Sequence, residues 1–137
     1  METYRQLWDD VLTLLRSKED LIGIPADKIN AGKYREAPSS APFLWIYMEP
    51  GDFVGISESH SGDGIATIMI FVGMKPAMNS MEANIAGHDV AATVVQILVQ
   101  SALPFLWGRQ PISLDEISTL YTAYRIETTA PYSLTEE

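Results

Sequence analysis

A long helical pattern covers residues 79–103 and limits the possible folds, because its apolar residues need another element to cover them. Asn79 and Glu82 match a capping box, in which two side chains satisfy backbone N–H groups at the start of a helix. Apolar residues recur at helical spacing, and we expect them to form one buried face. That expected face consists of Met81, Ile85, Val90, Ala91, Val94, Val95, Leu98, Val99 and Ala102. Alanines and Gly87 make the helix slim enough to lie close against a sheet.

Two apolar runs before this helix indicate β-strands. Phe43–Glu49 is rich in aromatic and branched residues and ends at a Pro-Gly turn signal. Ile65–Met74 is the second run and ends at a Lys-Pro pair. The polar, glycine-rich segment between the runs favours an antiparallel pair of strands. Two later segments, 112–117 and 121–128, alternate in polarity and predict two further strands.

The N-terminal region predicts a second helix, over residues 4–17. Its apolar residues fall on one stripe, and Thr3 with Gln6 matches a capping box. Residues 23–42 are punctuated by glycine and proline, and we interpret them as a long connector across the surface. We interpret residues 130–137 as a frayed acidic tail.

The predicted elements follow the order α, β, β, α, β, β. Helices and strands do not alternate strictly, so the chain is predicted to be an α+β domain spanning residues 1–137. We expect a mostly antiparallel sheet with the helices packed on one face.

Composition excludes several classes of function. The chain has no cysteine, so it forms no disulfide and uses no thiolate chemistry. Its formal net charge is −9, and its basic residues are scattered, which argues against tight binding to a phosphate backbone. Neither a signal peptide nor a membrane span is predicted, so we expect a soluble protein.

The segment "GISESHSGDG", residues 55–64, is the first place to look for chemistry. Glu58, His60 and Asp63 could bind a metal, and Ser59 or Ser61 with His60 and Asp63 could be imagined as a triad. Adjacent residues rarely point the right way for a triad, and two or three donors are too few for a closed metal site. We interpret the segment as a hairpin loop whose serine, aspartate and glycine residues supply turn chemistry. No catalytic, cofactor-binding or metal-binding residue is assigned.

His88 lies inside the long helix beside its apolar stripe. We expect a partly buried, hydrogen-bonded histidine rather than a catalytic base. The carboxylate pairs of the chain sit in polar or helix-terminal contexts and are interpreted as solvated surface. No phosphate-binding loop matches.

The aromatic stretch "LPFLWGRQP" offers another candidate surface. Tryptophan and arginine are enriched in the energetic centres of protein interfaces, whereas buried aromatics commonly close one end of a core. Both interpretations stay open. The candidate protein-contact residues are Phe53, His60, Asp63, Phe105, Trp107 and Arg109.

The layout also resembles a known family. The resemblance rests on three segments of the sequence. They are "APFLWIYMEPGDF", "GIATIMIFVGMK" running into "EANIAGHDVAATVVQIL", and the closing strand "YTAYRIETTAPY". This arrangement is similar to the small tail terminator and tail completion proteins of long-tailed bacteriophages and prophages. The resemblance is one of layout and carries no site residue over.

The resemblance implies a structural protein and not an enzyme. Subunits of this kind form homo-oligomeric rings, often six-fold, that dock on tail or head–tail connector proteins. The implied location is the host bacterial cytoplasm during assembly and then the virion tail. The acidic balance would let DNA pass through the ring without tight binding. The alternatives are a small enzyme or ligand-binding domain using residues 58–63, and a dimeric adaptor or regulatory domain.

Overall fold

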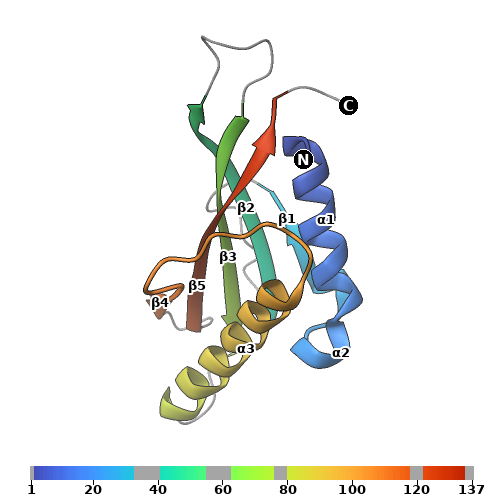
Figure 1. Cartoon of the computed structure of the whole chain (residues 1–137). Helices are drawn as coiled ribbons and strands as arrows, with labels where there is room; N and C mark the ends of the chain where they lie inside the picture. Colours follow the sequence, from blue (N-terminus) through green and yellow to red (C-terminus); the bar gives the residue numbers. More distant parts are fainter. Residues whose placement is uncertain (1, 33–40, 55–62, 76–79, 118–121, 135–137) are drawn as a thin grey trace.

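The computed structural model describes residues 2–32, 41–54, 63–75, 80–117 and 122–134. Its elements are α1 (Tyr4–Ser17), α2 (Glu19–Ile22), a short 3-10 helix (Ala26–Lys28), β1 (Ile29–Ala31), β2 (Phe43–Val54), β3 (Asp63–Met74), α3 (Ser80–Gln100), β4 (Ile112–Ile117) and β5 (Thr122–Ser133). The α+β class is confirmed, and Figure 1 shows α1 and α3 on the same side of the sheet.

The five strands form one sheet in the order β1-β2-β3-β5-β4. Strand β3 is central and pairs antiparallel with both β2 and β5, and β4 pairs antiparallel with β5. Strand β1 pairs parallel with β2 through Ile29–Ala31. The expectation of a mostly antiparallel sheet is therefore confirmed, and the short edge strand β1 makes the one parallel pairing among the described strands.

The capping box of α1 forms as its sequence predicts. The Thr3 backbone N–H donates to Gln6 Oε1 at 2.9 Å, and the Gln6 backbone N–H donates to Thr3 Oγ1 at 3.3 Å. Leu7, Val11 and Leu15 recur at helical spacing and are fully buried against the sheet. Local capping and burial of one face therefore agree on the same helix.

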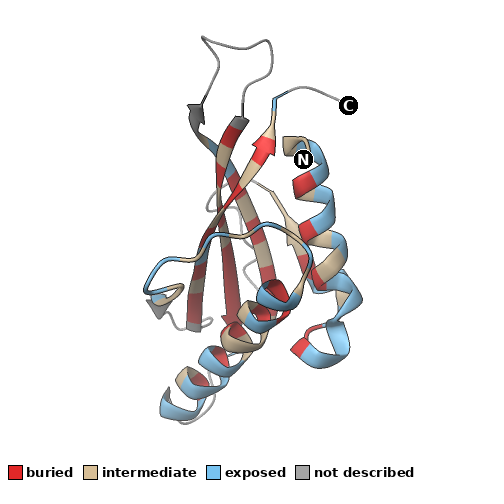
Figure 2. Ribbon diagram, viewed as in Figure 1, coloured by how far each residue is buried: buried red, intermediate tan, exposed pale blue. Residues whose placement is uncertain are grey.

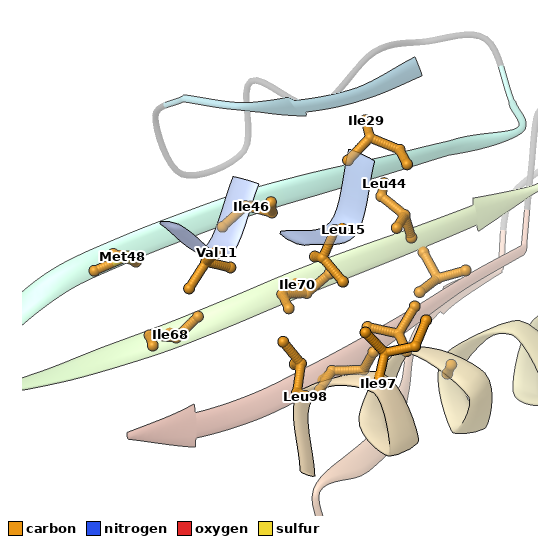
Figure 3. Packing of buried hydrophobic residues seen from close by; sticks show 14 of the residues in the cluster. Val11, Leu15, Ile29, Leu44, Ile46, Met48, Ile68, Ile70, Ile97 and Leu98 are labelled. Carbon is orange, nitrogen blue, oxygen red and sulfur yellow. The ribbon is translucent and has the colours of Figure 1, made fainter. Parts of the chain in front are cut away.

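The main core lies between the sheet and the two helices. Side chains alternate along each strand, so one half of each strand's residues points towards α1 and α3. On β3 these are Ala66, Ile68, Ile70 and Val72, all fully buried. Figure 3 shows Val11 and Leu15 of α1 and Ile97 and Leu98 of α3 meeting this layer. A smaller cluster on the opposite face contains Phe43 and Phe71.

The expected apolar face of α3 is wrong in part. Met81, Ile85 and Val99 are exposed, and so is Ala102 just beyond the helix. The residues buried against the sheet are Ala83, Gly87, Ala91, Val94, Ile97 and Leu98. Gly87 lets the helix approach closely, because a Cβ there would lie 2.9 Å from the Tyr124 ring. The helix carries more apolar residues than one face holds, so periodicity alone did not choose the buried set. Asn79, the expected cap, lies outside the described residues.

Two further expectations need correction. The connector 23–42 contains the 3-10 helix and β1, where Arg16 Nε donates to the Ile29 carbonyl at 2.8 Å and ties the segment to α1. The tail 130–137 is not frayed from its start, because β5 continues to Ser133 and buries Ala130 and Tyr132. Tyr132 packs edge-on against Tyr4 with ring centroids 5.1 Å apart, so contact with α1 orders this end of the strand.

A glycine in β3 tests the packing of the smaller cluster. Gly73 pairs with Phe43, and a Cβ on Gly73 would lie 2.1 Å from the Phe43 ring, which is 1% exposed. We expect Gly73→Ala to lower the free energy of unfolding by about 1–3 kcal/mol, the usual cost of overpacking. Urea denaturation measures the change.

The matched control for that prediction is Gly108→Ala. No heavy atom lies within 4 Å of the position of its added Cβ. We expect its free energy of unfolding to stay within about 0.5 kcal/mol of the parent, as for most surface substitutions. Equal effects of the two substitutions would contradict the proposed packing of Phe43 on Gly73.

Candidate functional site: a loop and hollow beside strand β5

The segment between α3 and β4 runs back along β5 and is fixed at two points. At the first, the Leu106 backbone N–H donates to the Thr129 carbonyl at 2.7 Å and the Thr129 N–H returns a bond of 3.2 Å. At the second, the Glu127 backbone N–H donates to the Pro111 carbonyl at 2.9 Å. Four residues, 107–110, connect these two points, whereas on β5 the single residue Thr128 separates the two anchoring positions. The extra length has to leave the sheet, and it forms the 107–110 loop.

A hollow of about 430 Å³ lies between this loop and β5. Its lining residues are Leu106, Trp107, Gly108, Arg109, Gln110, Glu127, Thr128 and Thr129. Thr128 is 2% exposed, and its Oγ1 donates to the Leu106 carbonyl at 2.8 Å. The base of the hollow is therefore a hydrogen-bonded strand, which holds the loop in a defined position.

Side chains alternate in exposure along this segment. Leu103, Phe105 and Trp107 are half-buried and pack against the main core. The rings of Phe105 and Trp107 lie 6.0 Å apart between centroids and are tilted by 52°. Leu106 points the other way and is 56% exposed. The aromatics of the stretch therefore help close the core. The protein-contact interpretation stays a prediction, for which Leu106 offers exposed apolar surface.

Arg109 supplies a positive charge at the rim of the hollow. Its side chain is exposed, and within the described part of the chain it makes no hydrogen bond or ion pair. Glu127, also exposed, lines the same hollow. A guanidinium can form two parallel hydrogen bonds with a carboxylate, so the rim could bind an acidic group of a partner.

The structure brings together only part of the candidate set. Phe105, Trp107 and Arg109 lie on one segment beside β5. The backbones of Phe53 and Asp63 lie at the paired ends of β2 and β3, where Asp63 also pairs with Ser133. Ser133, the β5 partner of Asp63, is four residues along the strand from Thr129, so these ends lie about 13 Å from the hollow. The side chains of Phe53 and Asp63, and the whole of His60, lie outside the described part.

His88 is exposed, so the expectation of a partly buried histidine is wrong. Its ring lies edge-on to Tyr124, with centroids 5.9 Å apart and planes at 77°. The Tyr124 hydroxyl donates to Asn84 Oδ1 on the same helix. The sheet-facing side of α3 is rotated from the expected one, which places His88 on the flank.

The described residues bear on the suggested metal site and on the expectation about membrane spans. Within them no group of three or more histidine, aspartate or glutamate side chains is placed to hold a metal ion. Glu58 and His60 of the suggested metal or triad site lie outside this part of the chain. None of the helices in the described ranges is long and apolar enough to cross a membrane.

Sequence reasoning missed the three β5 residues that line the hollow: Glu127, Thr128 and Thr129. The alternation within "LPFLW" is a signal that could have marked Leu106 as outward-facing. The three β5 residues carry no comparable signal, because they join the site through pairing with a distant segment. Comparison of the sequence with models of protein families and with curated proteins finds no match.

The clearest electrostatic perturbation lies away from the hollow, at the start of α1. Hydrogen bonding with the Asp10 side chain, followed by burial and the Asp10 charge, raises the pKa of Glu2 to about 7 from an ordinary 4.5. The backbone of Glu2 also joins the sheet, since its carbonyl accepts from the Ser133 N–H at 2.7 Å.

The raised pKa predicts a pH dependence of stability. Folding favours protonated Glu2, so this contribution is complete below about pH 4.5 and is lost as the pH rises through about 7. The substitution Glu2→Gln replaces the ionisable carboxyl group with a neutral amide. We expect the variant to match the parent near pH 5 and to be more stable at pH 8. The gain should be on the order of 1 kcal/mol, because solvent screens a partly exposed pair.

Chemical denaturation at a series of pH values measures this difference. Asp9→Asn is the control, since it removes an exposed carboxylate from the same helix. A stability difference between Glu2→Gln and the parent that does not change between pH 5 and pH 8 would refute the assignment.

Proposed function

We propose that this protein is a structural subunit of a bacteriophage or prophage tail, of the tail terminator or tail completion type. In this proposal the chain assembles into a closed ring and docks on neighbouring tail or head–tail connector proteins. It acts by contact and not by catalysis. Assembly takes place in the host bacterial cytoplasm and the subunit ends in the virion tail.

The observation that carries the proposal is the number of large apolar side chains left exposed on the folded chain. Among the described residues, seven large apolar side chains are more than two-fifths exposed. They are Leu21, Met81, Ile85, Val99, Leu106, Leu114 and Leu134. Most lie on α3 and along the segment from Leu106 to β4. Clustered exposed apolar residues are typical of surfaces that meet another protein.

The 107–110 loop is our candidate for one half of a contact between neighbouring subunits. A ring built by repeated rotation needs two different surfaces on each subunit, one facing each neighbour. Leu106 and Arg109 offer an apolar and a cationic group side by side. The chain is acidic overall, so carboxylates on the next copy are available to pair with Arg109.

The net charge of −9 also fits a ring through which DNA passes. A negatively charged lumen repels phosphates and keeps DNA from binding. A ring lined by basic residues would contradict this part of the proposal.

Solution mass tests ring formation. We expect light scattering after size exclusion to show a closed-ring mass, near six times the 15.2 kDa of one chain, as concentration rises. We expect Arg109→Glu to lower the ring fraction at least tenfold, because it replaces attraction to a carboxylate with repulsion.

Arg5→Glu is the matched control. It makes the same charge change at an exposed position in the first turn of α1, far along the chain from the loop. We expect it to leave the ring fraction unchanged. A mass that never exceeds two chains at any concentration would contradict the ring, and equal losses in both variants would contradict the role of Arg109.

A further inference from the structure

Helix α3 has a second apolar stripe beside the face that packs on the sheet. The stripe is only partly covered within the chain: Val95 contacts the main core and the His88 ring lies against Tyr124. Its residues are separated alternately by four and three positions. They are Met81, Ile85, His88, Ala92, Val95 and Val99, and we call this set the α3 seam. A helix turns once every 3.6 residues, so this spacing places all six on one side.

The seam is most exposed at its two ends and less so at Ala92 and Val95. Met81 is 63% exposed, Ile85 52% and Val99 58%. His88 is also exposed, and Ala92 and Val95 are partly so. Figure 2 shows exposed residues along the whole length of α3, alternating with half-buried and buried ones. The seam is therefore a continuous stripe rather than scattered single residues.

An alternation of four and three is the heptad repeat of coiled coils. In that arrangement each side chain of the stripe enters a space between four residues of a facing helix. The geometry therefore asks for a partner helix with the same repeat and of similar length. The α3 helix of a second copy meets both conditions.

We propose that two copies of the chain pair through the α3 seam, with their α3 helices antiparallel about a two-fold axis at Val90. Val90 is the midpoint of Ser80–Gln100, so the two helices overlap along their whole length. Met81 then faces Val99 of the second copy, and Ile85 faces its Val95. His88 faces Ala92, which sets the bulkiest ring opposite the smallest side chain.

The antiparallel arrangement follows from size and charge. A parallel pair would place His88 against His88 and Ala92 against Ala92, alternating a crowded layer with an empty one. In the antiparallel pair Glu82 lies beside Gln96 of the second copy, which is uncharged. The two Asp89 carboxylates lie near the axis, and their repulsion is screened by salt. Added salt should therefore strengthen the pair.

The contact is modest in size. With these side chains and their neighbours covered on both copies, the pair buries on the order of 1,000 Å², at the lower limit for a specific interface. Pairing should therefore depend on protein concentration over the micromolar range, on the order of a weak complex of this size.

This inference does not depend on the proposed tail function. A ring without the pair has the mass of a ring of single chains, and the pair without the ring has the mass of two chains. Both contacts together would join two rings face to face and double the ring mass. The two proposals can therefore fail separately.

Cysteine cross-linking tests the pair directly, because the chain has no native cysteine. We expect a mixture of Met81→Cys chains and Val99→Cys chains to form a disulfide-linked dimer on oxidation. Neither variant alone should form this dimer. In the antiparallel pair the same residue of the two copies is offset by eighteen residues along the helices, or about 27 Å. A disulfide needs Cα atoms within about 7 Å.

The cross-linking control mixes Met81→Cys with Gln100→Cys. Gln100 is adjacent to Val99 but points away from the seam, so no dimer should form. Cross-linking of either seam variant alone would overturn the antiparallel arrangement. Absence of dimer in the Met81→Cys and Val99→Cys mixture at all concentrations would overturn the pair.

A second test uses one charge at two neighbouring positions. We expect Val99→Glu to weaken self-association at least tenfold in sedimentation experiments and Gln100→Glu to change it less than twofold. Both sites are exposed in the single chain, so both variants should fold, which circular dichroism verifies. Equal association of the two variants would refute the seam as the contact.

Discussion

The pairing of β3 on both sides is the constraint on which the rest of the structure depends. All twelve residues of β3 pair with β5, and ten of its positions pair with β2 apart from one irregularity. A central strand cannot expose either edge, and its alternate residues must be covered on at least one face. Ala66, Ile68, Ile70 and Val72 face the helices, which fixes where α1 and α3 can lie.

Elements whose signals are local could be predicted from the sequence. Helix α1 was found at its observed bounds, because the capping box of Thr3 and Gln6 and the apolar stripe coincide. Strands β3 and β4 were found within two residues for a similar reason, since each is one apolar or alternating run between turn residues. Strand β1 was missed because three residues are too few for a pattern. It exists through pairing with β2.

The candidate site shows the same division between local and distant causes. Phe105, Trp107 and Arg109 stood out by composition, and the structure places them on one segment. The hollow beside them depends on the bridge between Leu106 and Thr129, which lie 23 positions apart in the chain. The loop exists because the two anchors on β5 are closer together than the segment between them is long. No local pattern encodes such a mismatch. The 55–62 segment, which drew most attention in the sequence, lies outside the described residues.

Helix α3 shows why a correct element can still be assigned the wrong face. Its residues form two apolar stripes, and a helix that is apolar on two sides is normally covered on two sides. The sheet needs a slim surface, which Ala83, Gly87 and Ala91 provide, because Tyr124 rises against the helix there. The bulkier Met81, Ile85 and Val99 could not fit on that side without moving the helix away from β5. Their spacing is regular, and all three side chains stay exposed in the single chain. In the proposed pair a second α3 helix would cover these exposed side chains, which the sheet of the single chain leaves open to solvent.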